Sequence, residues 1–200
     1  MKELLSTDCS FPTLVAGVDE VGRGCLFGPV VAAAVILPDE SISEFKTKGI
    51  RDSKQLTNVG RKKFDLIIRQ VALDYRIGYC SAAEIDQLNI FQASLLAMKR
   101  AVTKLKLRPN LCLVDGKWAI PDLGIPQKSI IKGDEQVLAI AAASIIAKVW
   151  RDELILRLAK KYPEYDLEAN KGYGTARHLL ALKEYGPSRH HRRSFRPCRD

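Results

Sequence analysis

The sequence predicts an α/β protein, in which a mixed sheet is flanked by helices and followed by a helical C-terminal part. Two observations carry this prediction. Short apolar segments of strand length recur through the first part of the chain, and segments with apolar residues at helical spacing separate and follow them. Several strands followed by several helices are typical of a sheet that is covered by helices.

The strands are predicted from short apolar runs bounded by glycine or polar residues. The first two runs lie on either side of the glycine-rich segment DEVGRG, and the short link between them indicates a hairpin. The predicted strands are 13–18, 28–37, 75–80, 111–114 and 129–131.

The helices are predicted from apolar residues that recur every three or four positions. Ser81 is suited to cap the helix that follows it, and Gly186 with Pro187 ends the last one. One helix begins with the almost wholly apolar run AIAAASIIA, which indicates that its first half is buried. The predicted helices are 54–73, 82–88, 90–105, 134–160 and 176–184.

The length and charge of the chain bound its organisation and its partners. Its 200 residues, 46% of them hydrophobic, fit one domain over 1–200, with a helical and basic extension from about residue 162. The net charge is +9, and residues 171–200 carry eight Lys or Arg against two acidic residues. This clustering points to a polyanion as partner, although a basic tail that is merely solvated explains the composition equally well.

The cysteines and the N-terminal sequence indicate the compartment. The five cysteines include no C-x-x-C pair and their number is odd, which argues against a zinc ribbon or a disulfide framework. The N-terminus has acids and a proline where a secretory signal needs an apolar run. The longest apolar run, 30–37, suits a buried strand rather than a membrane span. We expect a soluble cytoplasmic protein, a monomer, with no membrane association.

Three aspartates follow predicted strands directly. Asp19, Asp115 and Asp134 are each expected just beyond a strand end, where open α/β sheets gather their functional side chains. Glu20 adjoins Asp19, and although neighbours on a regular strand point to opposite faces, the glycines that follow permit the chain to turn. The alternative is that Asp115 and Asp134 are turn or N-cap residues, as Asp often is.

Carboxylates that converge in this way repel one another unless they are protonated or neutralised by cations. Because the ligands are all oxygens, Mg²⁺ or Mn²⁺ is the natural counter-ion. Two hard cations held by carboxylates are an established arrangement for phosphodiester hydrolysis. One ion generates the hydroxide nucleophile and the other stabilises the leaving oxygen.

The sequence resembles the ribonuclease HII family in segments that occur in one order over nearly the whole chain. They are GVDEVGRG (17–24), GPVVAAAV (28–35), DSK (52–54), VDG (114–116), KGD with AAASIIAKVWRD (132–134 and 141–152), KGYGT (171–175) and HRRSF (191–195). The resemblance implies a ribonuclease H-like fold, with a five-stranded mixed sheet, flanking helices and a C-terminal helical extension. Arg23 favours this family over the sister family ribonuclease HIII.

The resemblance also implies an activity and a set of site residues. The activity is endonucleolytic hydrolysis of the RNA strand of RNA/DNA hybrids and of single ribonucleotides in duplex DNA. The cut falls on the 5′ side of the ribonucleotide and leaves 5′-phosphate and 3′-hydroxyl ends. Carried over by motif, the catalytic, metal-binding acids are Asp19, Glu20, Asp115 and Asp134, with Mg²⁺ or Mn²⁺ as the cofactor.

The turn after the first acids is a candidate substrate contact. Backbone amides of Gly22 and Gly24 can approach a ribose or phosphate closely because no Cβ blocks them, and Arg23 can add a forked contact to a phosphate. Tyr173 lies between two glycines, which suits a ring that stacks on a sugar, although burial in a core is the commoner fate of Tyr.

Two further polar residues are weaker candidates for contact with the substrate. Lys54 fits a phosphate contact and a solvated lysine at a helix start equally well. Asn89 is weaker still, because a turn residue explains it. The arginines of the tail are expected to bind phosphates without reading sequence.

Asp152 is a second acid on the predicted helix 134–160. If that helix is continuous, Asp152 lies 18 residues beyond Asp134 on the same face, at a rise of about 27 Å. The two acids then cannot share a metal site. We expect Asp152 to pair with Lys148 one turn earlier, and Ser144 and Lys148 to serve packing or ion pairing.

Two other classes of protein compete with this interpretation. A non-catalytic nucleic-acid-binding module explains the basic tail but not the acids that follow the strands. A different two-metal nuclease on a similar sheet, such as a junction resolvase, explains the acids. Only the resemblance of the GRG and KGYGT segments argues against it.

Overall fold

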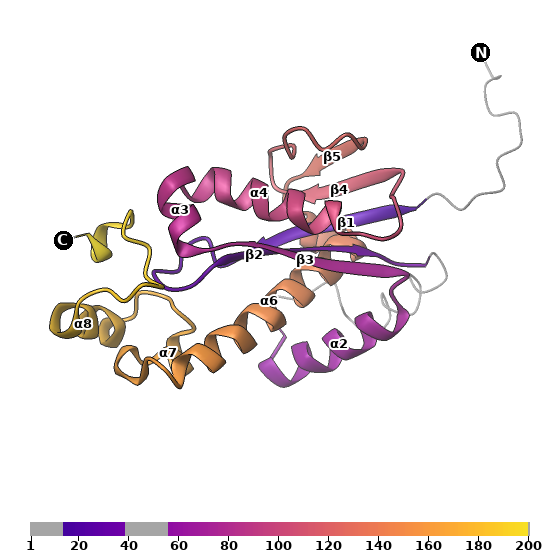
Figure 1. Ribbon diagram of the computed structural model, residues 1–200. Coiled ribbons are helices and arrows are strands. Elements are labelled where there is room, and N and C mark those ends of the chain that lie inside the picture. Colours follow the sequence, from indigo (N-terminus) through magenta and orange to yellow (C-terminus); the bar gives the residue numbers. More distant parts are fainter. Residues whose placement is uncertain (1–13, 39–55, 200) are drawn as a thin grey trace, which may run out of the picture.

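The computed structural model describes residues 14–38 and 56–199, and these form one five-stranded mixed sheet with helices on both faces (Figure 1). The strand order is β3-β2-β1-β4-β5, with β1 paired antiparallel to β2 and parallel to β4. The strands are β1 (Val15–Val21), β2 (Val30–Ile36), β3 (Asp74–Cys80), β4 (Leu111–Asp115) and β5 (Gln127–Ile130). The predicted fold class is confirmed, and so is the antiparallel pairing of the first two strands.

Two layers of helices cover the sheet, with α3 and α4 on one face and α2 and α6 on the other (Figure 1). Alternate residues of β2 divide between the two cores: Ala32 and Ala34 pack toward α4, whereas Val31 and Val35 pack toward α6. The described helices of these layers are α2 (Asn58–Val71), α3 (Ala82–Leu88), α4 (Ile90–Thr103), α5 (Gly133–Gln136) and α6 (Leu138–Ala159).

Side-chain caps set where α2 and α3 begin. Thr57 accepts a hydrogen bond from the Gly60 amide (3.1 Å), so α2 begins later than the predicted position 54, which itself lies outside the described residues. Ser81 and Glu84 form a capping box at the start of α3, which confirms the predicted cap.

The predicted helix 134–160 is interrupted. Val137 has extended backbone (φ −119°, ψ 118°), which a β-branched residue adopts readily, and it separates the single turn α5 from α6. The prediction of one continuous helix was therefore wrong, and the rise calculated from it for Asp152 does not apply.

The C-terminal part is helical, as predicted, and packs at the end of the sheet where β1 leads into β2 (Figure 1). Its apolar side chains form a third core with Leu26 and Phe27 of the β1–β2 connection. Its elements are η2 (Pro163–Tyr165), α7 (Leu167–Asn170), α8 (Ala176–Tyr185) and η3 (Arg196–Cys198).

Two buried arginines hold the β1–β2 connection in place. The Arg192 guanidinium donates to the carbonyls of Gly28 (3.0 Å), Arg23 (2.7 Å) and Gly22 (2.6 Å). Arg151 on α6 donates to three carbonyls in the same way, which belong to Phe27, Pro29 and Lys171. Both side chains are 0% exposed. The connection is thus fixed to the C-terminal segment by one arginine and to α6 by the other.

Arg192 corrects the expectation that all tail arginines bind phosphates. Its donors point to backbone carbonyls in the interior, so its positive charge is unavailable to a nucleic acid. The other tail arginines, Arg189, Arg193, Arg196 and Arg199, are exposed.

The described residues also bear on the cysteines and on membrane insertion. Cys25, Cys80, Cys112 and Cys198 are all buried and free. Within the described ranges, no helix combines the length and the apolar character that crossing a bilayer requires.

We predict that Arg192→Ala destabilises the protein by about 3 kcal/mol or more, because three carbonyls lose a charged donor in the interior. The matched control is Arg193→Ala, in which only an exposed side chain is removed; its effect should stay within about 0.5 kcal/mol. Urea denaturation of both variants measures the difference. Equal, small losses would contradict a structural role for Arg192.

Candidate active site

The first two acids lie within a strand rather than beyond it. β1 continues to Val21, because its pairing with β2 extends to Val21 opposite Val31. Asp19 and Glu20 are therefore strand residues, and the prediction that Asp19 follows the strand end was wrong. Asp115 is the last residue of β4, which runs parallel to β1, so both strands bring their acids to the same edge of the sheet.

Asp134 reaches this edge from a helix. β5 ends at Ile130, and Asp134 is the second residue of α5, close to the predicted helix start at 134. The Gly133 amide donates to Asp115 Oδ1 (2.7 Å), so α5 begins directly against the end of β4. An added Cβ at Gly133 would lie 2.6 Å from Ile140 Cδ1 and 3.4 Å from Asp115 Oδ1, so the Ile140 side chain would have to shift to admit it.

One cavity of about 360 Å³ brings the four predicted acids together. It is lined by Asp19, Glu20, Asp115 and Asp134, together with Val21, Arg61, Ser144, Ile145, Lys148 and Tyr173. Asp19 and Asp134 are buried. The structure thus places carboxylates, two basic groups and one aromatic ring around the same space.

Burial and mutual repulsion make this cluster unfavourable as a set of anions. Desolvation raises the pKa of Asp19 well above its usual range, and the charges of Glu20 and Asp115 raise it further. A hydrogen bond from Ser144 opposes that rise. Desolvation also raises the pKa of Glu20, while the Arg23 guanidinium, 3.2 Å from Glu20 Oε1, counteracts it. The cavity therefore favours an arriving cation.

The donor set fits hard divalent cations. Glu20 Oε2 is buried and has no hydrogen-bond partner among the described residues, and the four acids offer only oxygen ligands. Within the described ranges, no three acidic, histidine or cysteine side chains are arranged around one ion position. Ions such as Mg²⁺ take one or two protein carboxylates and complete their shell with water and substrate phosphate.

Three polar residues that line the cavity were not predicted to belong to it. Ser144 and Lys148 lie one turn apart on α6, and with Asp152 they form a polar stripe that begins in the otherwise apolar first half of the helix. That stripe is a signal in the sequence that the prediction of packing or ion pairing alone overlooked. Arg61 on α2 also lines the cavity, and no sequence feature separates it from its basic neighbours Lys62 and Lys63.

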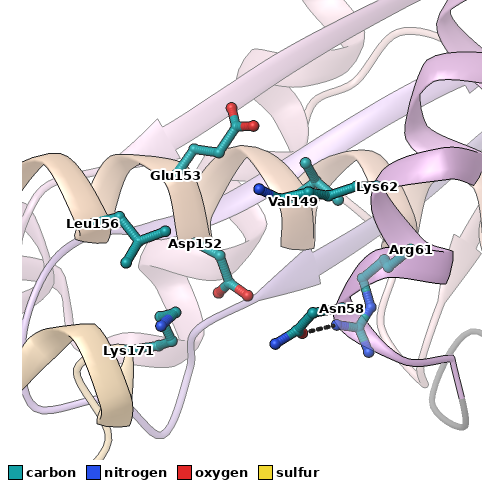
Figure 2. Close-up of a pocket in the computed structure, with 8 residues that line it drawn as sticks. All are labelled: Asn58, Arg61, Lys62, Val149, Asp152, Glu153, Leu156 and Lys171. Atoms are coloured by element: carbon teal, nitrogen blue, oxygen red, sulfur yellow. Dashed lines mark hydrogen bonds between the residues drawn. The ribbon is translucent and has the colours of Figure 1, made fainter.

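Asp152 lies outside this cavity and pairs with Lys148 (2.8 Å), as predicted. It lines an adjoining groove of about 140 Å³ between α2 and α6, where it faces Asn58 and Arg61 (Figure 2). Arg61 donates to Asn58 Oδ1 (3.0 Å) and lines both hollows. Arg61 therefore borders both the groove and the acidic cavity.

Tyr173 is held at the cavity by the loop 171–175. The Gly172 carbonyl accepts hydrogen bonds from the amides of Leu26 (2.8 Å) and Phe27 (3.2 Å), which fixes the loop against the β1–β2 connection. Gly172 has φ +89°, and a Cβ there would lie 2.7 Å from the Phe27 carbonyl oxygen. Tyr173 is 41% exposed, so part of this residue remains accessible.

The remaining predicted substrate contacts do not all lie at the acidic cavity. The turn Gly22-Arg23-Gly24 adjoins the acids, and Gly22 has φ +89° with the Arg151 side chain where a Cβ would stand. Asn89 caps α4 by accepting from the Phe91 and Gln92 amides, and it does not line the cavity. Lys54 lies outside the described residues.

Comparison with known proteins identifies the family. The family model for ribonuclease HII matches residues 16–198. The chain belongs to the ribonuclease HII family. A ribonuclease HII from Trichormus variabilis is 62% identical over 185 residues, which cover 92% of this chain and 82% of that protein. The predicted resemblance is confirmed.

Solved structures support the fold. The crystal structure of ribonuclease H2 from Pyrococcus horikoshii matches with a TM-score of 0.82 at 28% identity, over 93% of this chain and 95% of that one. A Bst-RNase HIII in complex with Mn²⁺ matches with a TM-score of 0.78 over 92% and 68% of the two chains. Its 20% identity shows the fold alone.

Membership of the family settles the class of protein. The chain is an enzyme of the ribonuclease H class, type HII, and a metal-dependent endonuclease. The non-catalytic nucleic-acid-binding module and the junction resolvase are therefore set aside.

We predict that Asp19→Asn raises the melting temperature of the metal-free protein. The raised pKa of Asp19 means that its charged form opposes folding at neutral pH, and the amide removes that charge. A gain of about 1 kcal/mol would raise the melting temperature by roughly 2–4 °C.

The matched control is Asp122→Asn, because the Asp122 side chain is 92% exposed. Calorimetry in chelator measures the melting temperature of the metal-free proteins, and calorimetry in increasing Mg²⁺ measures how much the ion raises it. Added Mg²⁺ should stabilise the wild type and the control more than Asp19→Asn. A metal-free Asp19→Asn that melts below the wild type would contradict the repulsion described above.

Proposed function

We propose that this enzyme hydrolyses the RNA strand of RNA/DNA hybrids and also single ribonucleotides within duplex DNA. The cut falls on the 5′ side of the ribonucleotide and leaves 5′-phosphate and 3′-hydroxyl ends. The observation that carries the proposal is the convergence of Asp19, Glu20, Asp115 and Asp134 on one cavity at the sheet edge. Membership of the ribonuclease HII family supports the hybrid as substrate.

The four acids would hold two divalent cations, Mg²⁺ or Mn²⁺. When bound, such ions activate the attacking water and stabilise the charge that develops on the leaving oxygen. The oxygen-only donor set and the raised pKa values of Asp19 and Glu20 support this assignment. The Mn²⁺ complex of a ribonuclease HIII with the same fold is consistent with it.

Basic groups of the chain would orient the substrate over the acids. Lys148 carries a positive charge into the cavity, and Arg61 extends the positive surface into the adjoining groove. The exposed tail arginines, Arg189, Arg193, Arg196 and Arg199, would add phosphate contacts that do not read sequence. Lys54 and Asn89 stay predictions as substrate contacts.

The turn Gly22-Arg23-Gly24 and Tyr173 would recognise the ribose. Only the 2′-hydroxyl distinguishes RNA from DNA at a given sugar, so a rigid polar surface must meet it. Arg192 holds the Gly22 and Arg23 carbonyls on the buried side, which makes the turn such a surface. The exposed part of Tyr173 would pack against the neighbouring sugar. We further propose that the enzyme acts as a monomer of one domain, 1–200, in the cytoplasm.

A first experiment tests the activity and the acids together. The substrates are a duplex with one ribonucleotide, a long RNA/DNA hybrid, and all-DNA and all-RNA duplexes. We expect metal-dependent cleavage of the first two only. Asp134→Asn should lose at least about 100-fold in single-turnover rate, because removing one charge-stabilising group costs that much at comparable sites.

Asp152→Asn is the matched control, since Asp152 lies outside the acidic cavity. It should keep its rate within a few fold and lose stability through the broken pair with Lys148. A rate loss in Asp152→Asn that equals that of Asp134→Asn would reverse the assignment. Cleavage of the all-DNA duplex would contradict the proposed substrate class.

A second experiment tests Tyr173. We predict that Tyr173→Ala reduces cleavage at an isolated ribonucleotide more than cleavage of a long hybrid. The reason is that an isolated ribonucleotide allows one register only, and misplacement of its phosphate lowers the rate. Single-turnover rates of wild type and variant on both substrates measure the ratio. Equal losses would show that Tyr173 does not read the junction.

A further inference from the structure

A chain of buried hydrogen bonds joins the Tyr173 loop to the C-terminal segment. His178 Nδ1 on α8 is 2.8 Å from the Tyr173 carbonyl oxygen, and His178 Nε2 is 2.9 Å from His191 Nε2. His191 Nδ1 is 3.0 Å from the Ser188 amide and 2.9 Å from the Ser188 hydroxyl. His178 and His191 are both buried. Three consecutive links, from Ser188 to His191, from His191 to His178 and from His178 to Tyr173, therefore lead to the loop at the cavity.

The hydrogen-bond partners of His178 and His191 fix the tautomer of each ring. A carbonyl only accepts, so His178 Nδ1 must carry the hydrogen, and in a neutral ring Nε2 is then an acceptor. His191 Nε2 must donate to it, which leaves His191 Nδ1 to accept from the Ser188 amide. Every donor meets an acceptor only when both rings are neutral and carry these particular hydrogens.

The surroundings favour neutral rings. The Tyr165 ring lies edge-on to both histidines, with centroids 5.9 Å from His178 and 4.6 Å from His191. Burial lowers the pKa of His178 and lowers that of His191 to about 3. Asp166 is the acidic group that opposes the shift at His178, and neighbouring His190 reinforces it at His191. Neither ring is therefore suited to proton transfer at neutral pH, which leaves an orienting role.

The loop needs such an orienting group because glycines flank Tyr173 on both sides. The Tyr173 carbonyl also accepts from the Thr175 amide (2.9 Å), and Thr175 caps α8. The His178 bond adds a donor that approaches from the body of α8 rather than from the loop itself. The direction of the Tyr173 peptide is thereby tied to α8.

We propose that His178 is a positioning residue for the ribonuclease reaction, held in its Nδ1–H tautomer by His191 so that it fixes the Tyr173 ring at the cavity. This inference rests on the proposed contact between Tyr173 and the sugar. It assigns specificity for an isolated ribonucleotide to two residues that never touch the substrate.

The first test is spectroscopic and needs no activity. The protein has three histidines, so ¹⁵N-histidine labelling of the full chain gives a simple spectrum, and His190→Asn identifies the third ring. Ring-nitrogen shifts should show His178 as the Nδ1–H tautomer and His191 as the Nε2–H tautomer, unchanged from pH 8 down to about 5. An Nε2–H tautomer at His178, or titration of either ring near pH 6.5, would overturn the proposal.

The second test uses two substitutions that each keep one nitrogen position of the ring. The Asn amide reaches where Nδ1 lies and the Gln amide where Nε2 lies, so His178→Asn keeps the donor to Tyr173 and His178→Gln removes it. His178→Gln should slow single-turnover cleavage at an isolated ribonucleotide about tenfold or more, with a smaller loss on a long hybrid. His178→Asn and the control His190→Asn should stay within about threefold of wild type.

A double variant shows whether His178 acts through Tyr173. Adding His178→Gln to Tyr173→Ala should lower the rate no further than Tyr173→Ala alone. Additive losses, or equal losses in folded His178→Asn and His178→Gln, would overturn the positioning role. If Tyr173→Ala alone has no effect, the proposed sugar contact fails and the positioning role fails with it. The tautomer spectrum then still decides whether the hydrogen-bond chain exists.

Discussion

The close approach of α6 to β1 is the contact on which the site depends. At Gly17 an added Cβ would lie 2.1 Å from the Ala139 carbonyl carbon, so the helix backbone rests directly on the strand. The alanines that begin α6 permit this approach because they add little thickness between the two backbones. Ser144 thereby reaches Asp19, and Lys148 one turn later reaches the same cavity. A larger residue at position 17 would displace the helix and separate these groups.

The acids illustrate how a functional site works against local stability. Burial raises the pKa of Asp19 and of Glu20, which are adjacent strand residues, and the charge of Asp115 raises both further. The surrounding structure tolerates this because the sheet is buried on both faces by well-packed apolar side chains. The buried guanidinium of Arg192 restrains the turn that follows these acids. The acids on β1 and the arginine that makes the next turn rigid therefore belong to separate parts of the chain.

Much of this arrangement is predictable from the sequence, because apolar periodicity and motif spacing report strands, helices and the four acids. The break at Val137 is not, because a valine with extended backbone leaves the apolar periodicity on both sides intact. Charge counting also misassigned Arg192, since it cannot tell a guanidinium that binds interior carbonyls from one that faces solvent. Ser144 and Lys148 were identifiable as a polar stripe, whereas Arg61 depends on where α2 packs, which only the tertiary structure gives.

The bond between Arg192 and Gly22 joins residues separated by 170 positions. A ribosome delivers the chain from its N-terminus, so β1 and its acids emerge long before the arginine that secures the turn after them. Until Arg192 leaves the exit tunnel, the carbonyls of Gly22 and Arg23 lack their interior donor. The nascent enzyme thus carries its acids without a finished turn.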